Sequence, residues 1–295
     1  MKVLELAPAK INLGLKIISK REDGYHNILS IFQTVDLYDE LEITFPFKPS
    51  KKRSIFLQPG LSCTNPEVPA GPENLVIKAE KLFREIFGNL PQVHFTLKKR
   101  IPIGGGLAGG SSDAAAALRG LKTLHNVDIP LNVLSEYASR LGSDVPFLIK
   151  GGTSVVSGRG EIIDNVKWPF DFTYVLVYPN LEVSTAWAYG NLKKVGNNNN
   201  AYQKMTEKLK GGILKVDEFF EELTNDFEET VFERYPVLST IKIQLMQNGA
   251  RKALLTGSGS TVLGIFEDKE TASHCAKILT KQNFKVFVVK AITII

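Results

Sequence analysis

The sequence has few cysteines, no long apolar run and no N-terminal segment of the kind that directs export. Cys63 and Cys275 lie far apart and outside any metal-ligand spacing, which argues against a disulfide framework or a zinc site. No run of about eighteen apolar residues occurs, so a transmembrane helix is not expected. Residues 1–5 contain neither an apolar h-region nor a small-residue cleavage site. We therefore expect a soluble, unprocessed, cytoplasmic protein with no membrane partner.

The charge of the chain is moderate and dispersed. A net charge of +5 on 295 residues suits an anionic ligand, and it equally suits weak affinity for nucleic acid. A nucleic-acid-binding module would carry a basic face with interleaved aromatic residues, whereas the basic runs here are no longer than Lys98–Arg100. We therefore expect no nucleic-acid partner. With 43% hydrophobic residues, the chain can bury a core.

Apolar periodicity predicts mixed helices and strands without regular βαβ alternation, which favours the α+β class. Extended segments are expected at 3–15, 37–45, 93–97, 174–178, 253–255, 262–266 and 286–294, with a hairpin at 151–161. Helices are expected at 75–87, 112–124, 131–141, 219–232, 237–248 and 271–280, and the asparagine-rich stretch 195–201 is expected to be a mobile loop. A change in composition near residues 160–170 predicts two domains, 1–162 and 163–295.

The most informative segment is a glycine-rich loop before an alanine-rich helix. Its glycines would let backbone N–H groups turn toward a bulky anion, and the free N–H groups and dipole of the helix N-terminus favour phosphate. Ser111, Ser112 and Asp113 are expected to cap this helix. A turn without a ligand is the alternative, but five glycines carry an entropy cost on the order of a few kcal/mol that a connector rarely needs. The expected phosphate-binding residues are Pro102, Gly104, Gly105, Gly106, Leu107, Ala108, Gly109, Gly110, Ser111 and Ser112.

Two common nucleotide-binding loops fit this segment poorly. A Walker A loop requires a lysine where Ser111 stands. Gly104-x-Gly106-x-x-Gly109 matches the dinucleotide fingerprint, but no acidic residue follows at a strand end at the ribose-binding distance. The loop is therefore neither an ordinary P-loop nor a good Rossmann loop.

Three ordered segments resemble the motifs of the GHMP kinase family. Residues 102–115 resemble its central ATP-binding motif, 7–13 its first motif and 255–262 its third, with Ala108 a minor variation where glycine is also usual. Four further segments resemble the branch of this family that phosphorylates 4-diphosphocytidyl-2-C-methyl-D-erythritol: 23–26, 141–147, 183–189 and 225–228. The resemblance implies two α+β domains, the first like ribosomal protein S5 domain 2, with the active site in the cleft between them.

The resemblance also implies an activity and its catalytic residues. The expected reaction is ATP-dependent phosphorylation of the 2-hydroxyl of that substrate, a step of non-mevalonate isoprenoid biosynthesis. Asp144 would be the general base and Lys10 its ion-pair partner. From the residues alone, Asp144 could instead cap a helix before Pro146, and Lys10 could snorkel from an edge strand.

The ligand contacts follow from the same resemblance. Tyr25 and Tyr189 would stack on the cytosine, His26 would hydrogen-bond its edge, and Asn12 and Thr185 would be polar contacts to the substrate. ATP is the expected cosubstrate, with Asn74, Leu75 and Lys99 as adenosine contacts. Mg²⁺ is expected with it, although no acidic ligand is evident and Ser111 or Ser112 is the only candidate. A GHMP kinase for homoserine or mevalonate is the alternative, and only the substrate-contacting residues would separate it.

Overall fold

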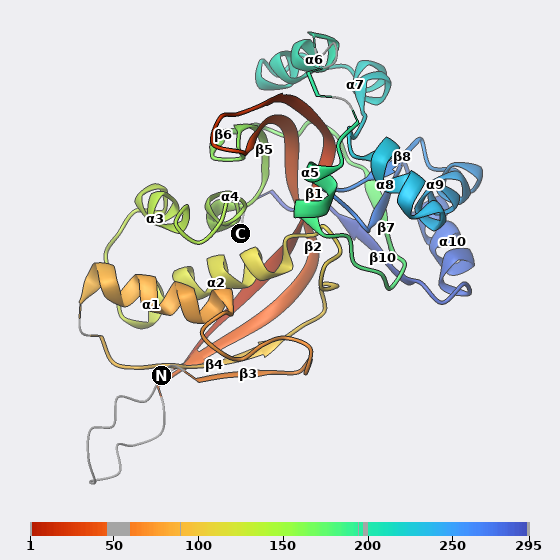
Figure 1. Cartoon of the computed structure of the whole chain (residues 1–295). Helices are drawn as coiled ribbons and strands as arrows, with labels where there is room; N and C mark the ends of the chain where they lie inside the picture. The colour runs from red at the N-terminus through yellow and green to blue at the C-terminus, as the bar shows by residue number, and fades with distance from the viewer. Residues whose placement is uncertain (1, 46–59, 89, 194, 197–199, 294–295) are drawn as a thin grey trace.

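A computed structural model describes residues 2–45, 60–88, 90–193, 195–196 and 200–293 of the chain. Its first domain is built on a sheet with the strand order β3-β4-β2-β5-β6, in which β1 also pairs with β2 (Figure 1). The pairs are antiparallel apart from the parallel pair β3–β4. The strands are β1 (Lys2–Lys20), β2 (His26–Thr44), β3 (Gly60–Cys63), β4 (His94–Lys98), β5 (Thr153–Gly158) and β6 (Ile162–Asn165).

The hairpin β1–β2 is longer than periodicity predicted. Pro8 lies within β1, because a register shift between Pro8 and Ala9 accommodates the proline in the strand. β2 begins at His26 rather than near Leu37, because residues 30–35 are buried on both faces and show no polar alternation. The predicted hairpin at 151–161 is present as β5–β6 and extends to Asn165.

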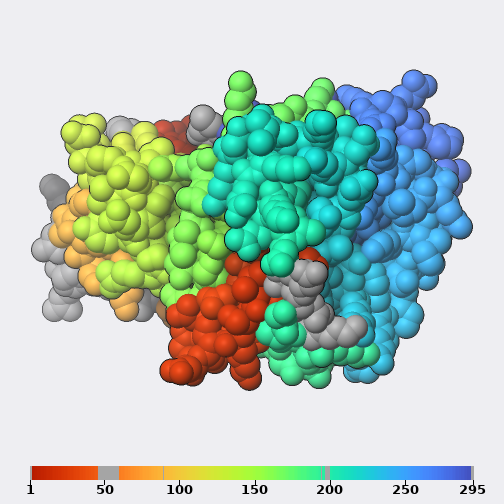
Figure 2. All heavy atoms as spheres, turned by 90° about the horizontal axis from the view of Figure 1, so that it is seen from above, coloured from red at the N-terminus to blue at the C-terminus, as the bar shows by residue number. Residues whose placement is uncertain are grey.

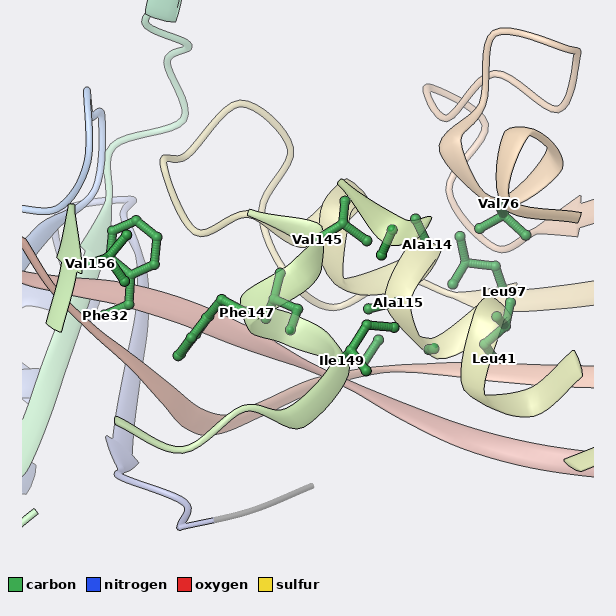
Figure 3. Close-up of a cluster of buried hydrophobic side chains, with 14 of the residues drawn as sticks. Phe32, Leu41, Val76, Leu97, Ala114, Ala115, Val145, Phe147, Ile149 and Val156 are labelled. Atoms are coloured by element: carbon green, nitrogen blue, oxygen red, sulfur yellow. The ribbon is translucent and has the colours of Figure 1, made fainter. Parts of the chain in front are cut away.

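Among the described residues, four helices belong to the first domain. They are α1 (Leu75–Phe87), α2 (Gly109–Leu124), α3 (Leu131–Ala138) and α4 (Val145–Lys150). The four alanines 114–117 of α2 are fully buried, because their small side chains let the helix lie close to the long hairpin. Figure 3 shows Phe147 of α4 beside Phe32 of β2, and the two rings are 5.5 Å apart. This core places the start of α2 and the start of α4 beside β1.

The predicted cap of α2 is wrong. The helix begins at Gly109, and its N-cap Ala108 has a left-handed backbone (φ 54°) and no capping side chain. The Ser112 hydroxyl instead donates to the Pro8 carbonyl at 2.7 Å, and the Asp113 carboxylate accepts from Lys99 at 2.8 Å. Ser112 and Asp113, which local propensity assigned to capping, are therefore hydrogen-bonded to residues distant in the sequence.

The second domain is built on an antiparallel sheet with the order β10-β7-β9-β8. Seen from above, the part of the chain coloured teal to blue lies beside the part coloured orange to yellow-green (Figure 2). The predicted boundary between residues 162 and 163 falls inside β6, whereas the sheets change between Asn165 and Thr173. The boundary itself stays a prediction. The strands are β7 (Thr173–Tyr178), β8 (Lys252–Leu255), β9 (Val262–Phe266) and β10 (Lys285–Lys290).

In the part of the second domain that the structure describes, the helices are α5 (Thr185–Gly190), α6 (Asn200–Lys210), α7 (Val216–Glu222), α8 (Glu228–Arg234), α9 (Pro236–Gln247) and α10 (Lys269–Thr280). The single helix predicted over 219–232 is wrong, because Asn225 bridges to Leu15 of β1 and separates α7 from α8. In the predicted loop 195–201, residues 197–199 lie outside the described residues, and Asn200 already begins α6. The predicted final strand ends at Lys290, and Ile294 is outside the described residues. None of the helices described is long and apolar enough to cross a membrane.

Candidate active site

A cavity of about 1050 Å³ is lined by residues of both domains. The first domain contributes the glycine loop 102–111 together with Lys10, Asn12 and Asp144. The second contributes the loop 257–259, together with Thr185 and Tyr189 of α5. Of all the residues predicted to bind ATP or substrate, only the buried Ser112 does not line this cavity.

The glycine loop is held by the third sequence motif. Gly106 has a left-handed backbone (φ +74°), and a Cβ atom there would lie 2.6 Å from the Thr256 carbonyl oxygen. The Thr261 N–H donates to the Gly105 carbonyl at 3.2 Å, and the Lys10 N–H donates to the Leu107 carbonyl at 3.0 Å. The loop therefore has a defined shape and leads into the N-terminus of a sixteen-residue helix, a combination that binds phosphate.

Lys10 and Asp144 form an ion pair at the cavity. The Lys10 Nζ is 3.4 Å from the Asp144 Oδ2, donates to the Asn12 Oδ1 at 3.1 Å, and lies 4.1 Å from the centre of the Phe32 ring. The Lys10 side chain is 6% exposed, so it does not snorkel to the surface. Asp144 occupies the N-cap position of α4, but its side chain makes no capping hydrogen bond and is 31% exposed. The carboxylate is thus available to a ligand.

Aromatic side chains line the cavity near the turn between β1 and β2. His26 and Tyr189 stack with ring centroids 5.0 Å apart, and Phe227 meets Tyr189 edge-on at 4.9 Å. Tyr25 is 57% exposed, and the guanidinium of Arg159 lies 5.1 Å from its ring. Tyr25 and Tyr189 therefore have different neighbours.

Burial and charge set the protonation of these aromatic residues. Burial lowers the pKa of His26, and the charge of Lys20 lowers it further. The imidazole is therefore neutral near pH 7, with one nitrogen that donates and one that accepts. Burial, and after it the negative charge of Asp144, raises the pKa of Tyr189 to about 12. Its hydroxyl therefore keeps its proton.

Two polar residues of the predicted substrate site are tied to the loop at 256–258. The Thr185 and Ser258 hydroxyls are hydrogen-bonded at 2.9 Å. The Asn12 N–H donates to the Thr256 Oγ1 at 2.8 Å, and its side-chain amide donates to the Ser30 Oγ at 2.9 Å. These bonds join β1 and α5 to the third motif.

The residues predicted to contact adenosine line the same cavity. Asn74 caps α1 by accepting from the Val76 N–H at 2.8 Å. Lys99 is buried between two carboxylates, at 2.5 Å from Asp39 and 2.8 Å from Asp113. Burial would lower the pKa of Lys99, but the charges of Asp113 and Asp39 outweigh it and raise that pKa. Lys99 therefore stays charged, and its ammonium donates hydrogen bonds to Asp39 and Asp113 within the protein.

The part of the chain that the structure describes has no cluster of side chains that could hold a metal ion. No three His, Cys, Asp or Glu side chains come together there. Ser111 lines the cavity, whereas the Ser112 hydroxyl is turned to the Pro8 carbonyl. A cation at this site would need ligands from elsewhere, such as the oxygens of a bound polyphosphate.

Several site residues were not selected from the sequence. Ser258 and Phe227 lie inside segments that resemble the family's motifs, but the resemblance implied no role for either residue. Phe32 had no signal at all, because an apolar residue in a buried strand is normally part of the core. Its contact with the Lys10 ammonium depends on how two neighbouring strands pair.

Comparison with known proteins gives consistent matches along the chain. Residues 74–152 match the family model "GHMP kinases N terminal domain", and residues 211–285 match "GHMP kinases C terminal". The chain is 40% identical to the 4-diphosphocytidyl-2-C-methyl-D-erythritol kinase of Bacillus cereus (strain B4264) over 265 residues, covering 90% of this chain and 88% of the relative. The protein of the same name from Bacillus anthracis (strain CDC 684 / NRRL 3495) matches to the same extent.

Solved structures give the same picture. A crystal structure of 4-(cytidine 5'-diphospho)-2C-methyl-D-erythritol kinase is 30% identical, with a TM-score of 0.79 that covers 98% of this chain and 99% of that one. The homoserine kinase of Cytophaga hutchinsonii ATCC 33406 is 18% identical, with a TM-score of 0.76 that covers 99% of this chain and 95% of that one. The second likeness is one of fold alone.

Proposed function

The chain belongs to the GHMP kinase family, among its 4-diphosphocytidyl-2-C-methyl-D-erythritol kinases, and we propose that it phosphorylates the 2-hydroxyl of 4-diphosphocytidyl-2-C-methyl-D-erythritol with ATP. The products are the 2-phosphate and ADP, in a cytoplasmic step of non-mevalonate isoprenoid synthesis. The observation that carries the proposal is the Lys10–Asp144 pair, which lies in one cavity with the glycine loop and the His26–Tyr189 stack.

The glycine loop and the start of α2 hold the phosphates of ATP in this proposal. ATP, when bound, supplies the γ-phosphoryl group. The negative charge of the phosphates is compensated by backbone N–H groups at 104–110 and by the positive end of the α2 dipole. Asn74, Leu75 and Lys99 contact the adenosine at the same cavity. The residues at the cavity therefore fit a nucleoside triphosphate.

Asp144 manages the proton of the acceptor hydroxyl. As the acceptor oxygen bonds to the γ-phosphorus, the bond from that phosphorus to the bridging oxygen of ADP breaks. The hydroxyl proton passes to the Asp144 carboxylate, which is free of any capping bond. Lys10 pairs with this carboxylate and, held by Asn12 and Phe32, offsets negative charge at the transferring group.

The aromatic residues recognise the cytidine part of the substrate. A neutral His26 can donate one hydrogen bond and accept another at the edge of the cytosine. Tyr25 and Tyr189 offer ring faces for stacking, and Thr185 and Asn12 offer polar contacts. Mg²⁺, when bound with ATP, would help to neutralise the charge of the phosphates, and the Ser111 hydroxyl is the candidate ligand from this chain at the cavity.

The test measures ADP release by the purified protein with Mg-ATP and 4-diphosphocytidyl-2-C-methyl-D-erythritol, with homoserine and mevalonate in parallel. Turnover with the cytidyl substrate alone, lost in Asp144→Asn, is the expected result. Turnover with another acceptor alone would leave the assignment as a kinase standing and would overturn the assignment of the cytidine-binding residues. Full turnover by Asp144→Asn would overturn the assignment of the base.

A further inference from the structure

Arg119 is a buried arginine of α2 that the proposed mechanism does not use. Its side chain is 8% exposed, and it lies outside the cavity. The Nε donates to the Glu5 Oε2 at 3.0 Å, the Nη1 to the Leu148 carbonyl at 2.8 Å, and the Nη2 to the Leu6 carbonyl at 2.7 Å. One planar group thus joins α2, β1 and α4.

Each of these three elements carries part of the proposed chemistry. Leu6 lies four residues before Lys10 on β1. The Leu148 N–H donates to the Asp144 carbonyl at 3.2 Å, so Leu148 and Asp144 belong to the same turn of α4. α2 itself begins at the glycine loop. Arg119 therefore bonds to the strand that carries the lysine and to the short helix that carries the carboxylate.

We infer that Arg119 is a positioning residue that sets the separation between the Lys10 ammonium and the Asp144 carboxylate. This inference rests on the proposed function of that pair. α4 is only six residues long and has no capping side chain at its start, so its placement depends on tertiary contacts. The bond from Arg119 to the Leu148 carbonyl orients this helix relative to β1.

The chemistry of arginine explains why this residue type suits the position. The guanidinium presents its N–H donors in one rigid plane, and three of them bond in diverging directions here. Lysine keeps the charge but cannot hold the same three acceptors in that geometry. Methionine has a comparable length but offers no donor, and it would leave the buried Leu148 carbonyl, the Leu6 carbonyl and the Glu5 carboxylate without this partner.

Positioning and mere stabilisation predict different kinetics. A residue that only stabilises the fold would lower the unfolding midpoint and leave the turnover of each folded molecule unchanged. A positioning residue lowers kcat, because displacement of a reacting group by about 1 Å can cost about a hundredfold in rate. The KM values of ATP and substrate should change little, because Arg119 does not line the cavity.

The experiment compares Arg119→Met and Arg119→Lys with Arg140→Met. Arg140 makes an exposed ion pair with Glu85 and serves as the matched control for loss of an arginine charge. We expect kcat to fall about 10- to 100-fold in Arg119→Met and less in Arg119→Lys, with both KM values within about threefold of wild type. Arg140→Met should retain wild-type kcat. Unchanged kcat in folded Arg119 variants would overturn the inference.

A double-mutant cycle and a crystal structure separate this inference from the proposed function. In the Asp144→Asn background, Arg119→Met should lower single-turnover rates by less than about threefold further, because both changes act on one pair. Independent, multiplying losses would show a structural role and overturn the inference. A crystal structure of Arg119→Lys, the variant best able to fold, should show a Lys10–Asp144 separation longer than the present 3.4 Å. An unchanged separation would overturn the inference even if the protein acted on another acceptor.

Discussion

The imidazole of His26 stacks directly on the phenol ring of Tyr189, with centroids 5.0 Å apart and an angle of 23° between the planes. A base cannot enter between two rings at this spacing. It must meet an outer edge or face of the pair, and Phe227 already packs edge-on against Tyr189. The pair therefore acts as one preformed element, and Tyr25 is the more exposed of the two tyrosines at the cavity.

Replacement of Tyr189 should weaken binding of the cytidyl substrate. We expect Tyr189→Leu to raise the KM of that substrate about tenfold or more, because a lost base–aromatic stack costs about 1–3 kcal/mol. The KM of ATP should stay near wild type. Tyr137→Leu is the matched control, since Tyr137 contacts Phe87 and does not line the cavity. Equal changes in both KM values for Tyr189→Leu would contradict a role in base recognition.

Replacement of Gly106 by alanine should disrupt the glycine loop. The left-handed backbone (φ +74°) disfavours alanine, and its Cβ would lie 2.6 Å from the Thr256 carbonyl oxygen and 2.7 Å from that of Gly259. We expect Gly106→Ala to raise the dissociation constant of ATP about tenfold or more, as measured by titration calorimetry. Gly211→Ala is the control, because its nearest neighbouring atom would be 3.5 Å away. Wild-type affinity in Gly106→Ala would show that the third motif does not hold the loop.

Asn225 should matter for stability. Its side-chain amide donates to the Leu255 carbonyl at 2.7 Å and to the Gly257 carbonyl at 2.8 Å, and the residue is buried. Asn225→Ala removes both donors, and we expect the free energy of unfolding to fall by about 2–4 kcal/mol in urea denaturation. Asn191→Ala, which loses one exposed bond to the Trp187 carbonyl, should cost less than about 1 kcal/mol. Similar losses in both variants would contradict this account.

Asp113 should make stability depend on pH. Burial raises the pKa of its carboxyl to about 7; the charge of Lys99 lowers that pKa and the charge of Asp39 raises it. Between the unfolded value of 3.8 and about 7, the folded protein therefore binds more protons at this site than the unfolded chain does. The stability that this group contributes is present at low pH and is lost as the pH rises through about 7.

Asp113→Asn tests this sign. Asparagine resembles the protonated carboxyl at every pH, so the variant should gain stability relative to wild type between about pH 5 and about pH 8. The measurement is the free energy of unfolding of both proteins at the two pH values. A constant difference would show that Asp113 does not titrate in this range.

The glycine loop and the helix after it were predictable because both depend on local sequence. Glycines next to one another in the chain lie next to one another in the loop, and an alanine-rich segment forms a helix by propensity alone. The break at Asn225 was not predictable, because this residue bonds to Leu255 and Gly257, some thirty residues away. The long hairpin was underestimated for a related reason: where both faces of β2 are buried, the alternation that marks a strand disappears.

The sequence by itself determined the family, the glycine loop before α2 and the list of residues to consider, since these depend on residue types in order along the chain. Tertiary structure alone decided which of them meet. Lys10 and Asp144 are 134 positions apart, and their pairing depends on how α4 packs on α2 and how α2 packs on β1. It also decided that Ser112 turns to Pro8 rather than to the cavity, and that Arg119 joins three elements. Hydrogen bonds and ion pairs of this kind form only where folding brings distant segments within about 3 Å, a distance that no local pattern encodes.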